Sequence, residues 1–573
     1  MSPSEKSAAP PSGRAVPVFA GIAATLGLAA YSGSFRAALL PDDIRAILEN
    51  PSIRELWPLS TPLSPALGTT LSGRPVANLS FALNYAAGGF DFFGYHLVNI
   101  LILVASAVVL FALLKRTFAS GKAGAVSGRR ADLLSGVVAL LWLLHPVATQ
   151  ITTQLSQRVE SLMELFFLLT LYLSARGFAS QKRRVAWHAA ALSAFFLGLG
   201  SKEVIVTAPL VVLAYAWVFE GGPLLSHLKR NKALYLGFCA LLLLMAWHVS
   251  RGEQETSARA PFARLDYLST QSLVIFYYLR LIFFPSPLCY DHRLGLFSPS
   301  RAWPFLLALS VLILATAWLL RKRRPAGFAL FFFLATLAPT SSILPLPQTM
   351  TDYRPHLGGA AMLAAAAVLL HHLARKLGPR AVTAIFIAGC ALVPVFGGLT
   401  YARNLDYASP VTLWADTARK RPHNYMAHHN LGNALVDEGR YPEAIAAYDA
   451  AIRDNPFYFE AYLSRGVALA RLGHYPEAEK SIRAALAIVP NYPEAHLSLG
   501  AVLLWSGRRN EALTEFQRAA TLSPGYVNAH LNLGLLYRAM NRPQDARREL
   551  SEALRLDPSR TDVRAALKDA GGG

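Results

Sequence analysis

The sequence predicts an all-α protein in two parts, a polytopic membrane domain followed by a solenoid of helical repeats. Of its 573 residues, 53% are hydrophobic and only 16% are charged, whereas water-soluble proteins usually carry about 25% charged residues. Apolar stretches recur from Ala15 to Thr400, and the chain beyond them repeats with a period of 34 residues. This composition excludes a purely soluble enzyme and a disordered tail protein.

Eleven apolar segments are predicted to cross the membrane. A helix needs about 20 residues to cross the hydrocarbon core, and several of these segments are slightly shorter. Lys6 and Arg14 precede the first segment, which is therefore similar to a signal peptide. We expect it to stay uncleaved as an anchor, because the orientation of the later spans requires it. The segments are residues 15–34, 94–114, 131–147, 159–175, 185–200, 204–219, 233–249, 302–320, 326–339, 358–373 and 381–399.

Clusters of Lys and Arg predict the orientation, because they mark the cytoplasmic side of short loops. Eleven spans with a cytoplasmic amino terminus place every cluster in the cytoplasm and the repeats on the outer side. The net charge of +20 is then largely a topology signal rather than a nucleic-acid-binding surface. The clusters are Lys6/Arg14, Lys115/Arg116/Arg129/Arg130, Lys182/Arg183/Arg184, Lys229/Arg230/Lys232, Arg321/Lys322/Arg323/Arg324 and Arg375/Lys376/Arg380.

One apolar segment, Thr270–Phe284, is predicted not to span the membrane. It is short and carries Arg280. Counting it as a span would reverse the orientation of the later spans and place the basic cluster at Arg321–Arg324 on the outer side of the membrane. We expect an interfacial or re-entrant helix on the outer face, with Tyr277 and Tyr278 at the level of the headgroups.

The repeats after Thr400 follow the tetratricopeptide pattern, in which small residues lie where paired helices touch and a proline follows the second helix. Four repeats are predicted at 425–458, 459–492, 493–526 and 527–560, after a lone second helix around Trp414. Such arrays present a concave surface that binds peptides or partner proteins, and the alternative is a spacer. The recurring residues are Pro422, Pro456, Pro490, Pro524 and Pro558; Gly432, Gly466, Gly500 and Gly534; and Ala444, Ala478, Ala512 and Ala546.

Acidic residues occur together with basic ones in several of the predicted outer connections. Arg and Lys bind phosphate oxygens in charge-assisted hydrogen bonds, and a nearby carboxylate can deprotonate a hydroxyl group. The combination predicts transfer of a group from a lipid phosphate to a hydroxyl acceptor on the outer face. The residues are Asp42, Asp43, His145, Arg158, Glu160, Glu164, Lys202, Glu203, Asp291, His292, Arg293, Asp352, Arg354 and His356.

Each of these clusters also has a structural explanation. The adjacent aspartates are favoured residues for capping a helix, and a Lys202–Glu203 ion pair at a turn would contribute little energy. Arg158 can extend toward phospholipid headgroups. His145 precedes a proline and is typical of a helix end.

A metal site is not established by the sequence. Glu160 and Glu164 share a helix face and, with His145, have a spacing that would suit a divalent cation. The three cysteines are too few and too widely spaced to predict a disulfide framework or a thiolate metal site. They are Cys239, Cys289 and Cys390.

A series of motifs runs in order along nearly the whole chain: PDDIRAILENP, GRPVANLSFALNY, GYHLVNILIL, LHPVATQITTQLSQRVESL, SKEVIVTAP, YYLRLIFFPSPLCYD, LAPTSSILPL and TYARNLDYASPVTLW. With these motifs the chain resembles the transmembrane and tetratricopeptide-repeat-containing O-mannosyltransferases. These proteins belong to the GT-C glycosyltransferases, so the resemblance implies a GT-C-like membrane domain and inversion at the transferred sugar.

The resemblance implies transfer of mannose from a polyprenyl-phosphate donor to Ser or Thr of exported proteins. The pair Asp42 and Asp43 would then carry the catalytic aspartate, and which of the two it is stays open. Arg158, Lys202 and Arg354 would bind the donor phosphate, with a supporting group around them. Its members are His145, Glu160, Glu203, Asp291 and Asp352. The segment TDYRPHLGG departs from the family pattern at Asp352, where a Glu is expected.

These inferences predict the division of the chain into a cytoplasmic tail (1–14), a membrane domain (15–400), a linker with a half-repeat (401–424), four repeats (425–560) and a carboxy-terminal tail (561–573). The repeats would bind the acceptor or a partner protein. The array is shorter than in animal members, which favours a bacterial inner-membrane protein with periplasmic repeats. Two alternatives are an outer-face ligase of lipid-pyrophosphate-linked glycan and a non-enzymatic repeat scaffold.

Overall fold

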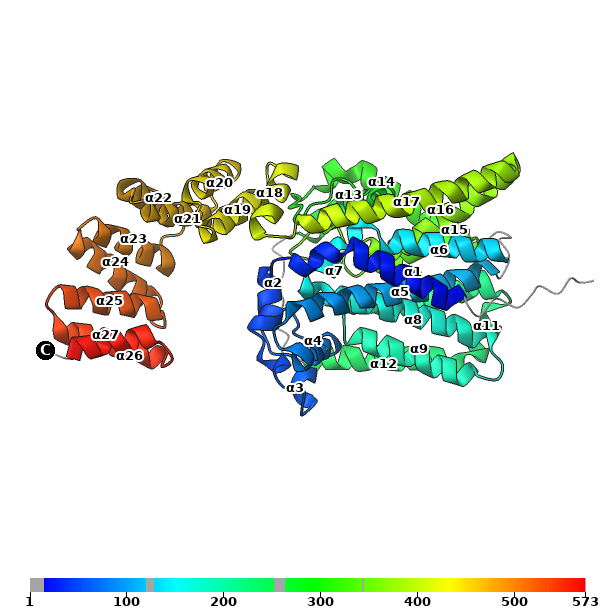
Figure 1. The fold of residues 1–573 in the computed structure, drawn as a ribbon, viewed down its shortest axis with the longest axis horizontal. Helices are drawn as coiled ribbons and strands as arrows, with labels where there is room; N and C mark the ends of the chain where they lie inside the picture. The colour runs from blue at the N-terminus through cyan, green and yellow to red at the C-terminus, as the bar shows by residue number, and fades with distance from the viewer. Residues whose placement is uncertain (1–14, 120–127, 252–262, 343–344, 572–573) are drawn as a thin grey trace, which may run out of the picture. The chain divides into compact units, whose positions relative to one another are not determined.

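Helices are the regular secondary structure of the residues that the computed structural model describes, which are 15–119, 128–251, 263–342 and 345–571 (Figure 1). No strand occurs in these ranges, so the predicted all-α class is confirmed. The cytoplasmic tail predicted at residues 1–14 lies outside the described residues. The chain divides into two compact units, Met1–Ser409 and Pro410–Gly573.

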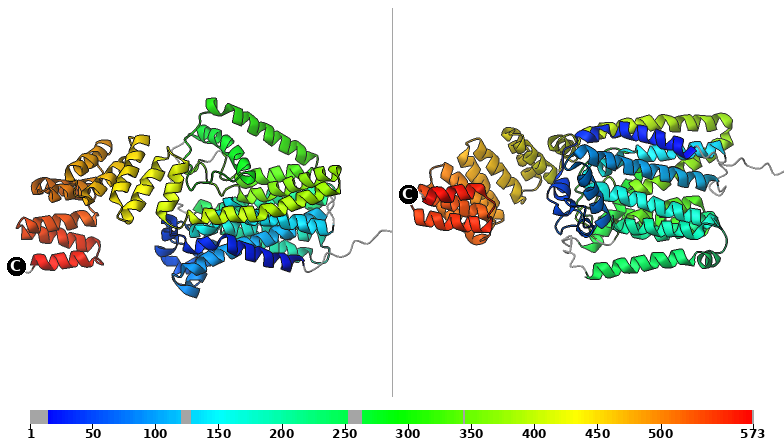
Figure 2. Two further views of the ribbon diagram at one scale, coloured as in Figure 1. Left: turned by 45° about the horizontal axis from the view of Figure 1, so that its top comes forward. Right: turned by 60° about the horizontal axis from the view of Figure 1, so that its bottom comes forward.

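Long helices run side by side through the first unit (Figures 1 and 2). Its helices are α1 (Ala15–Ala30), α2 (Pro41–Asp43), α3 (Ser60–Leu63), α4 (Pro75–Gly88), α5 (Phe92–Ala119), α6 (Arg129–Leu143), α7 (Thr149–Thr153), α8 (Arg158–Ala179), α9 (Arg184–Leu199), α10 (Ala208–Tyr215), α11 (Leu224–Arg230), α12 (Lys232–Arg251), α13 (Arg264–Phe283), α14 (Pro299–Arg321), α15 (Pro325–Leu337), α16 (His356–Leu377) and α17 (Pro379–Leu405). Short 3-10 or π turns extend or connect them at Ser32–Arg36, Ile44–Leu48, Pro51–Ile53, Pro146–Ala148, Leu155–Gln157, Glu203–Thr207 and Ala216–Glu220.

Every segment predicted to span the membrane is helical. Among the described residues, six helices are long and apolar enough to cross a bilayer, and the bent pair Arg129–Leu143 and Pro146–Thr153 adds a seventh. Shorter apolar helices cover Ala15–Ala30, Arg184–Leu199, Lys232–Trp247 and Pro325–Leu337. Their limited length leaves the number of eleven spans a prediction.

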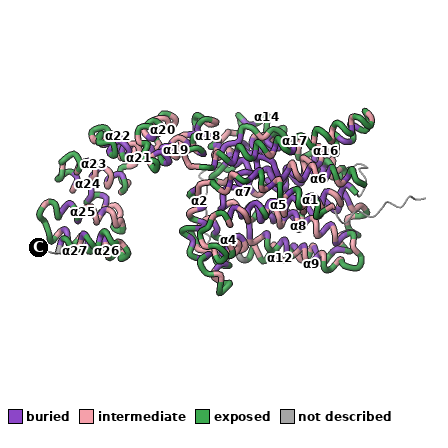
Figure 3. Tube along the Cα trace, in the orientation of Figure 1, coloured by how far each residue is buried: buried purple, intermediate pink, exposed green. Residues whose placement is uncertain are grey.

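Large apolar side chains lie on the outside of this unit. Along α14, exposed residues follow one another (Figure 3), and the side chains of Leu307, Val311 and Leu314 are 58–69% exposed. Contiguous exposed apolar surface is unfavourable in water. The pattern is therefore that of a helix bundle surrounded by lipid.

Polar and irregular segments gather at the two ends of the bundle. The short elements α2, α3 and α4 lie at one end, and α11, with Lys229 and Arg230, lies at the other (Figures 1 and 2). A small apolar core that includes Ile47 and Phe81 joins the first loop to Val159 at the start of α8. This core fixes the loop that carries the two aspartates.

The apolar segment after Thr270 is part of α13, a helix that packs within the protein. The side chain of Tyr278 is fully buried, and its hydroxyl accepts a hydrogen bond from the Thr351 amide at 3.1 Å. The expectation that Tyr278 lies at the lipid headgroups is therefore wrong, because the connection before α16 covers it.

The second unit consists of paired helices in the predicted register. A single helix, α18 (Pro410–Lys420), precedes four pairs and α27 (Thr561–Gly571) follows them. Ala566 and Ala570 of α27 are buried, so much of the segment predicted as a tail is a helix that closes the apolar core. The pairs are α19 (Tyr425–Asp437) with α20 (Tyr441–Asp454), α21 (Phe459–Arg471) with α22 (Tyr475–Ile488), α23 (Pro493–Trp505) with α24 (Arg509–Leu522), and α25 (Val527–Ala539) with α26 (Pro543–Leu556).

The recurring glycines allow close contact between the two helices of each pair. A Cβ atom at Gly500 would lie 2.6 Å from the ring of Phe516, and the other three glycines meet the partner helix at 2.4–2.5 Å. We expect Gly500→Ala to destabilise the repeats by about 1–3 kcal/mol, because overpacking forces neighbouring groups apart. Thermal unfolding of the full chain in detergent measures this effect.

Gly525→Ala is the matched control, because no atom lies within 4 Å of a Cβ built there. Equal melting temperatures for the two variants would contradict the packing role of Gly500.

Candidate active site

Asp43 holds the first loop against the start of α8. Its Oδ2 accepts a hydrogen bond from the Leu40 amide at 3.1 Å, and its Oδ1 accepts one from the Ser156 amide at 2.7 Å. The side chain is buried. Burial raises the pKa of Asp43 to about 6, although both hydrogen bonds oppose that shift. Asp43 is therefore a buried residue that joins two segments distant in sequence.

Asp42, the neighbouring residue, is placed differently. It is partly exposed, and the Thr70 hydroxyl donates to its backbone carbonyl at 3.2 Å rather than to its side chain. Within the described part of the chain, no donor contacts its carboxylate. A carboxylate with free acceptor positions can take a proton from a ligand, so Asp42 suits a general base better than Asp43 does.

Arg158 is fully buried among residues of the first unit. Its Nε donates to Asn99 at 2.6 Å, and its two terminal nitrogens donate to the Asn84 side chain and to the carbonyls of Ser80 and Tyr95. The guanidinium also lies 4.2 Å from the centre of the Phe81 ring. Four of its five N–H groups are thus used within the protein, an arrangement that favours a structural role.

Lys202 and Arg354 lie beside a small cavity of about 20 Å³, near the volume that one water molecule occupies. Lys202 pairs with Glu160 and lies 5.8 Å from the centre of the Tyr353 ring. Arg354 donates to the Gln348 carbonyl at 3.0 Å through Nη2, whereas its buried Nη1 has no partner among the described residues. An unsatisfied guanidinium nitrogen at a cavity is a site for an anionic oxygen.

Glu164 also lines this cavity, and it pairs with His356. Nδ1 of His356 lies 3.0 Å from both Glu164 carboxylate oxygens, and Nε2 lies 3.1 Å from the Trp142 carbonyl. The imidazole stacks on Trp142 with ring centres 4.3 Å apart. Both ring nitrogens face acceptors, so the pair is arranged to hold a shared proton.

The other supporting residues are placed outside this cavity. His145 accepts a hydrogen bond from the Val147 amide and contacts the Ile282 carbonyl, the arrangement of a helix-end residue. Glu203 faces Arg74 at 4.0 Å with about half of its side chain exposed. Asp291 accepts from the Arg293 amide at 3.0 Å. The structure does not gather His145, Glu160 and Glu164 into a cation site, because each has a different partner.

Two neighbouring tyrosines, Tyr290 and Tyr407, are influenced by charges of the first loop and of Asp352. Burial raises the pKa of Tyr290, and the charges of Asp42, Tyr407, Asp43 and Tyr353 raise it further. Burial also raises the pKa of Tyr407, which Arg403 lowers and Asp352 raises. The two rings lie 6.3 Å apart. Asp42 therefore influences the pKa of one tyrosine and Asp352 that of its neighbour.

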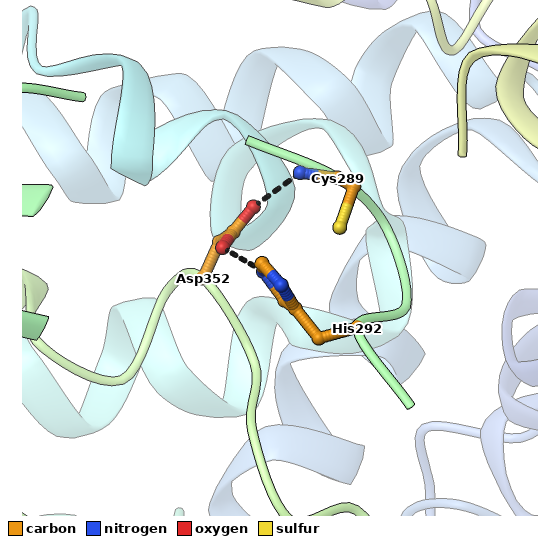
Figure 4. A group of neighbouring side chains, drawn as sticks. All are labelled: Cys289, His292 and Asp352. Carbon is orange, nitrogen blue, oxygen red and sulfur yellow. Dashed lines mark hydrogen bonds and ion pairs between the residues drawn. The ribbon is translucent and has the colours of Figure 1, made fainter. Parts of the chain in front are cut away.

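Asp352 is buried beside Cys289 and His292 (Figure 4). Its Oδ2 accepts a hydrogen bond from the Cys289 amide at 2.7 Å, and its Oδ1 pairs with Nε2 of His292. Burial lowers the pKa of His292, but Asp352 outweighs this effect and raises it to about 9. This is the one group of metal-ligand type found among the described residues.

Comparison with known proteins bears on most of the chain. Protein O-mannosyl-transferase Tmtc3 of Drosophila melanogaster is 25% identical over 505 residues, which cover 74% of this chain and 54% of that protein. Human TMTC1 is 24% identical over 506 residues, covering 76% and 55%. The resemblance indicated by the motifs is confirmed. The chain spans about half the length of the curated relatives it matches.

The second unit is a tetratricopeptide-repeat domain. Family models described as tetratricopeptide repeats match residues 398–450, 429–493 and 503–570, as the period of 34 residues predicted. Among solved structures, the tetratricopeptide-repeat protein YrrB is 22% identical and covers 32% of this chain and 91% of that chain, with a TM-score of 0.25.

The sequence did not predict some of the polar residues near Asp42 and Asp352. Tyr290, Arg403 and Tyr407 were not selected, because nothing local distinguishes them from interfacial aromatics or a span-end cation. The spacing of Cys289 and His292, two ligand types separated by two residues, was a usable signal. The wide spacing of the cysteines argues only against pairs of thiolates and does not bear on a mixed group of this kind.

We expect Arg158→Lys to lower the melting temperature strongly. A lysine ammonium cannot reproduce the planar set of contacts with Asn84, Asn99 and Tyr95, and each lost buried bond costs about 1–3 kcal/mol. Arg354→Gln serves as the control, because Nη2 of Arg354 donates to one backbone carbonyl and its Nη1 has no partner among the described residues. Equal stability of Arg158→Lys and the parent, together with weaker donor binding, would assign Arg158 to the ligand instead.

The raised pKa of Asp43 predicts a pH-dependent term in the stability. The folded-state pKa of about 6 exceeds the ordinary value of 3.8, so this contribution is fully present below pH 3.8 and is lost as pH rises through 6. From pH 7 to 5, we expect the parent to gain about 1 kcal/mol relative to Asp43→Asn. Melting curves of both proteins at each pH measure the difference, and a pH-independent difference would contradict the assignment.

Proposed function

We propose that the protein transfers mannose from a polyprenyl-phosphate donor to Ser or Thr hydroxyls of exported proteins. The similarity to proteins named O-mannosyl-transferases supports the reaction class. One observation supports assigning the reaction to this site. The carboxylate of Asp42 accepts no hydrogen bond from the described residues, whereas both carboxylate oxygens of the adjacent Asp43 do.

In this reaction Asp42 accepts the proton of the acceptor hydroxyl as its oxygen attacks the anomeric carbon of the donor. The bond between that carbon and the phosphate oxygen breaks, and the lipid phosphate leaves with the bonding electrons. Attack opposite the leaving group inverts the anomeric carbon, as in GT-C enzymes. Asp43 positions the loop through its two amide contacts and takes no part in proton transfer.

Arg354 and Lys202 bind the donor phosphate. The unsatisfied Nη1 of Arg354 supplies a directed donor, and Lys202 adds positive charge from the neighbouring turn. When the bond between the sugar and the phosphate breaks, these two cations stabilise the negative charge on the leaving phosphate. Arg158 supports the helix packing behind the first loop rather than binding the donor.

The proposed reaction takes place at one face of the bilayer. The donor tail lies among apolar helices while its phosphate reaches the polar end of the bundle that carries α2. We place this end in the periplasm of a bacterial inner membrane, opposite the basic segment Lys229/Arg230. The repeats bind the acceptor protein or a partner.

Asp42→Asn should abolish transfer while leaving folding intact. We expect a loss of about 100- to 10,000-fold in rate, which is typical of removing a general base, with an unchanged melting temperature. Asp43→Asn should instead lower the melting temperature, because an amide cannot accept from both the Leu40 and Ser156 N–H groups. The assay uses purified full-length protein, a polyprenyl-phosphate-linked mannose and an envelope-protein acceptor.

A parallel donor series distinguishes the alternatives. Transfer from an oligosaccharide-pyrophosphate lipid but not from the monosaccharide phosphate would identify a glycan ligase. If no donor supports transfer, and cells carrying Asp42→Asn keep all phenotypes that deletion of residues 425–560 removes, the protein is a scaffold. Glycopeptide mass spectrometry of the same strains tests for hexose on Ser and Thr.

A further inference from the structure

Cys289, His292 and Asp352 form a group with the composition of a transition-metal site. All three side chains are buried, and their ligand atoms lie within 4.8 Å of one another. Two residues come from the connection between α13 and α14, and the third comes from the connection between α15 and α16 (Figure 4). A thiol, an imidazole and a carboxylate are costly to bury together, because each loses hydration on burial.

We propose that these three residues bind a zinc ion. Zinc accepts sulfur, nitrogen and carboxylate ligands in tetrahedral geometry, and sites with three protein ligands take water as the fourth. The softer thiolate and imidazole disfavour magnesium and calcium, which prefer oxygen ligands.

The surrounding hydrogen bonds already orient the ligands. The Cys289 amide occupies Oδ2 of Asp352, which leaves Oδ1 directed at Nε2 of His292 and so at the proposed ion. The His292 ring packs edge-on against Tyr277, with ring centres 5.7 Å apart. Such outer contacts fix ligand geometry in metal proteins. On binding, zinc replaces the Cys289 thiol proton and the proton between His292 and Asp352.

The ion would position part of the proposed donor site. Asp352 is followed directly by Tyr353 and Arg354, which line the cavity. A metal bond across the two connections restricts this loop, so metal loss should raise the KM for the donor more than it lowers kcat. This consequence rests on the proposed function, whereas metal binding itself does not.

The first test is the metal content of the full chain purified in detergent from zinc-replete cells. We expect about one zinc per chain in the parent, less than a tenth of that in Cys289→Ala, and parental content in Cys390→Ala. Cys390 is the matched control, because it is an exposed free cysteine in the same unit. Zinc absent from the parent, or equal in Cys289→Ala, would overturn the proposal.

A second measurement keeps the test valid if Cys289→Ala folds poorly. A zinc chelator should lower the melting temperature of the parent, and added zinc, but not magnesium, should restore it. Asp352→Asn keeps an acceptor for the Cys289 amide but lacks the charge, and we expect it to respond weakly to chelator. A parent indifferent to both chelator and zinc would show that His292 and Asp352 form a metal-free ion pair.

The two proposals fail separately. Zinc bound in a protein that transfers no sugar would leave the metal site standing and remove the proposed reaction. Sugar transfer by a protein that takes up no zinc even when zinc is added would leave the proposed reaction standing and remove the metal site.

Discussion

The buried carboxylate of Asp43 fixes the position of the first loop, and the geometry of the candidate site depends on this contact. A carboxylate removed from water requires donors to compensate for lost hydration. The amides of Leu40 and Ser156 provide them, so the loop is held against the start of α8. Successive residues of a helical turn point about 100° apart, and Asp42 is thereby directed away from the same donors.

Charge compensation determines which cation is available to a ligand. Lys202 is paired with Glu160, His356 with Glu164, and His292 with Asp352. Arg158 is surrounded by neutral acceptors that occupy most of its donors. Of the three cations predicted to bind the donor phosphate, Arg354 has a buried nitrogen without a partner among the described residues, which makes its Nη1 the best placed of their groups for an anionic oxygen.

The fold was largely predictable, and the site was predictable only in part. Repeat boundaries followed from the spacing of prolines, glycines and alanines, since identical contacts recur between paired helices. Apolar segments were located well, although four form helices too short to establish a span by length alone. Arg158 and Arg354 could not be separated, because the acceptors of Arg158 lie 59 and 74 residues away in sequence. The burial of Tyr278 could not be predicted for a similar reason, because the loop at Thr351 that buries its side chain is distant in sequence.

The sequence by itself determined the helical class, the apolar character of the first unit, the register of the repeats and the set of polar residues among which the site lies. These properties follow from the amino-acid composition and from the periodicity of the sequence, and they depend on contacts between residues close in the chain. The tertiary structure decided which of these side chains can bind a ligand. The carboxylate of Asp43 is hydrogen-bonded within the protein and that of Asp42 is not, and the guanidinium of Arg158 is enclosed whereas that of Arg354 keeps an unsatisfied nitrogen. The tertiary structure also brought Cys289 beside His292 and Asp352. The physical reason is that burial and hydrogen-bond satisfaction are set by segments distant in sequence, and they alone determine which polar group retains capacity for a ligand.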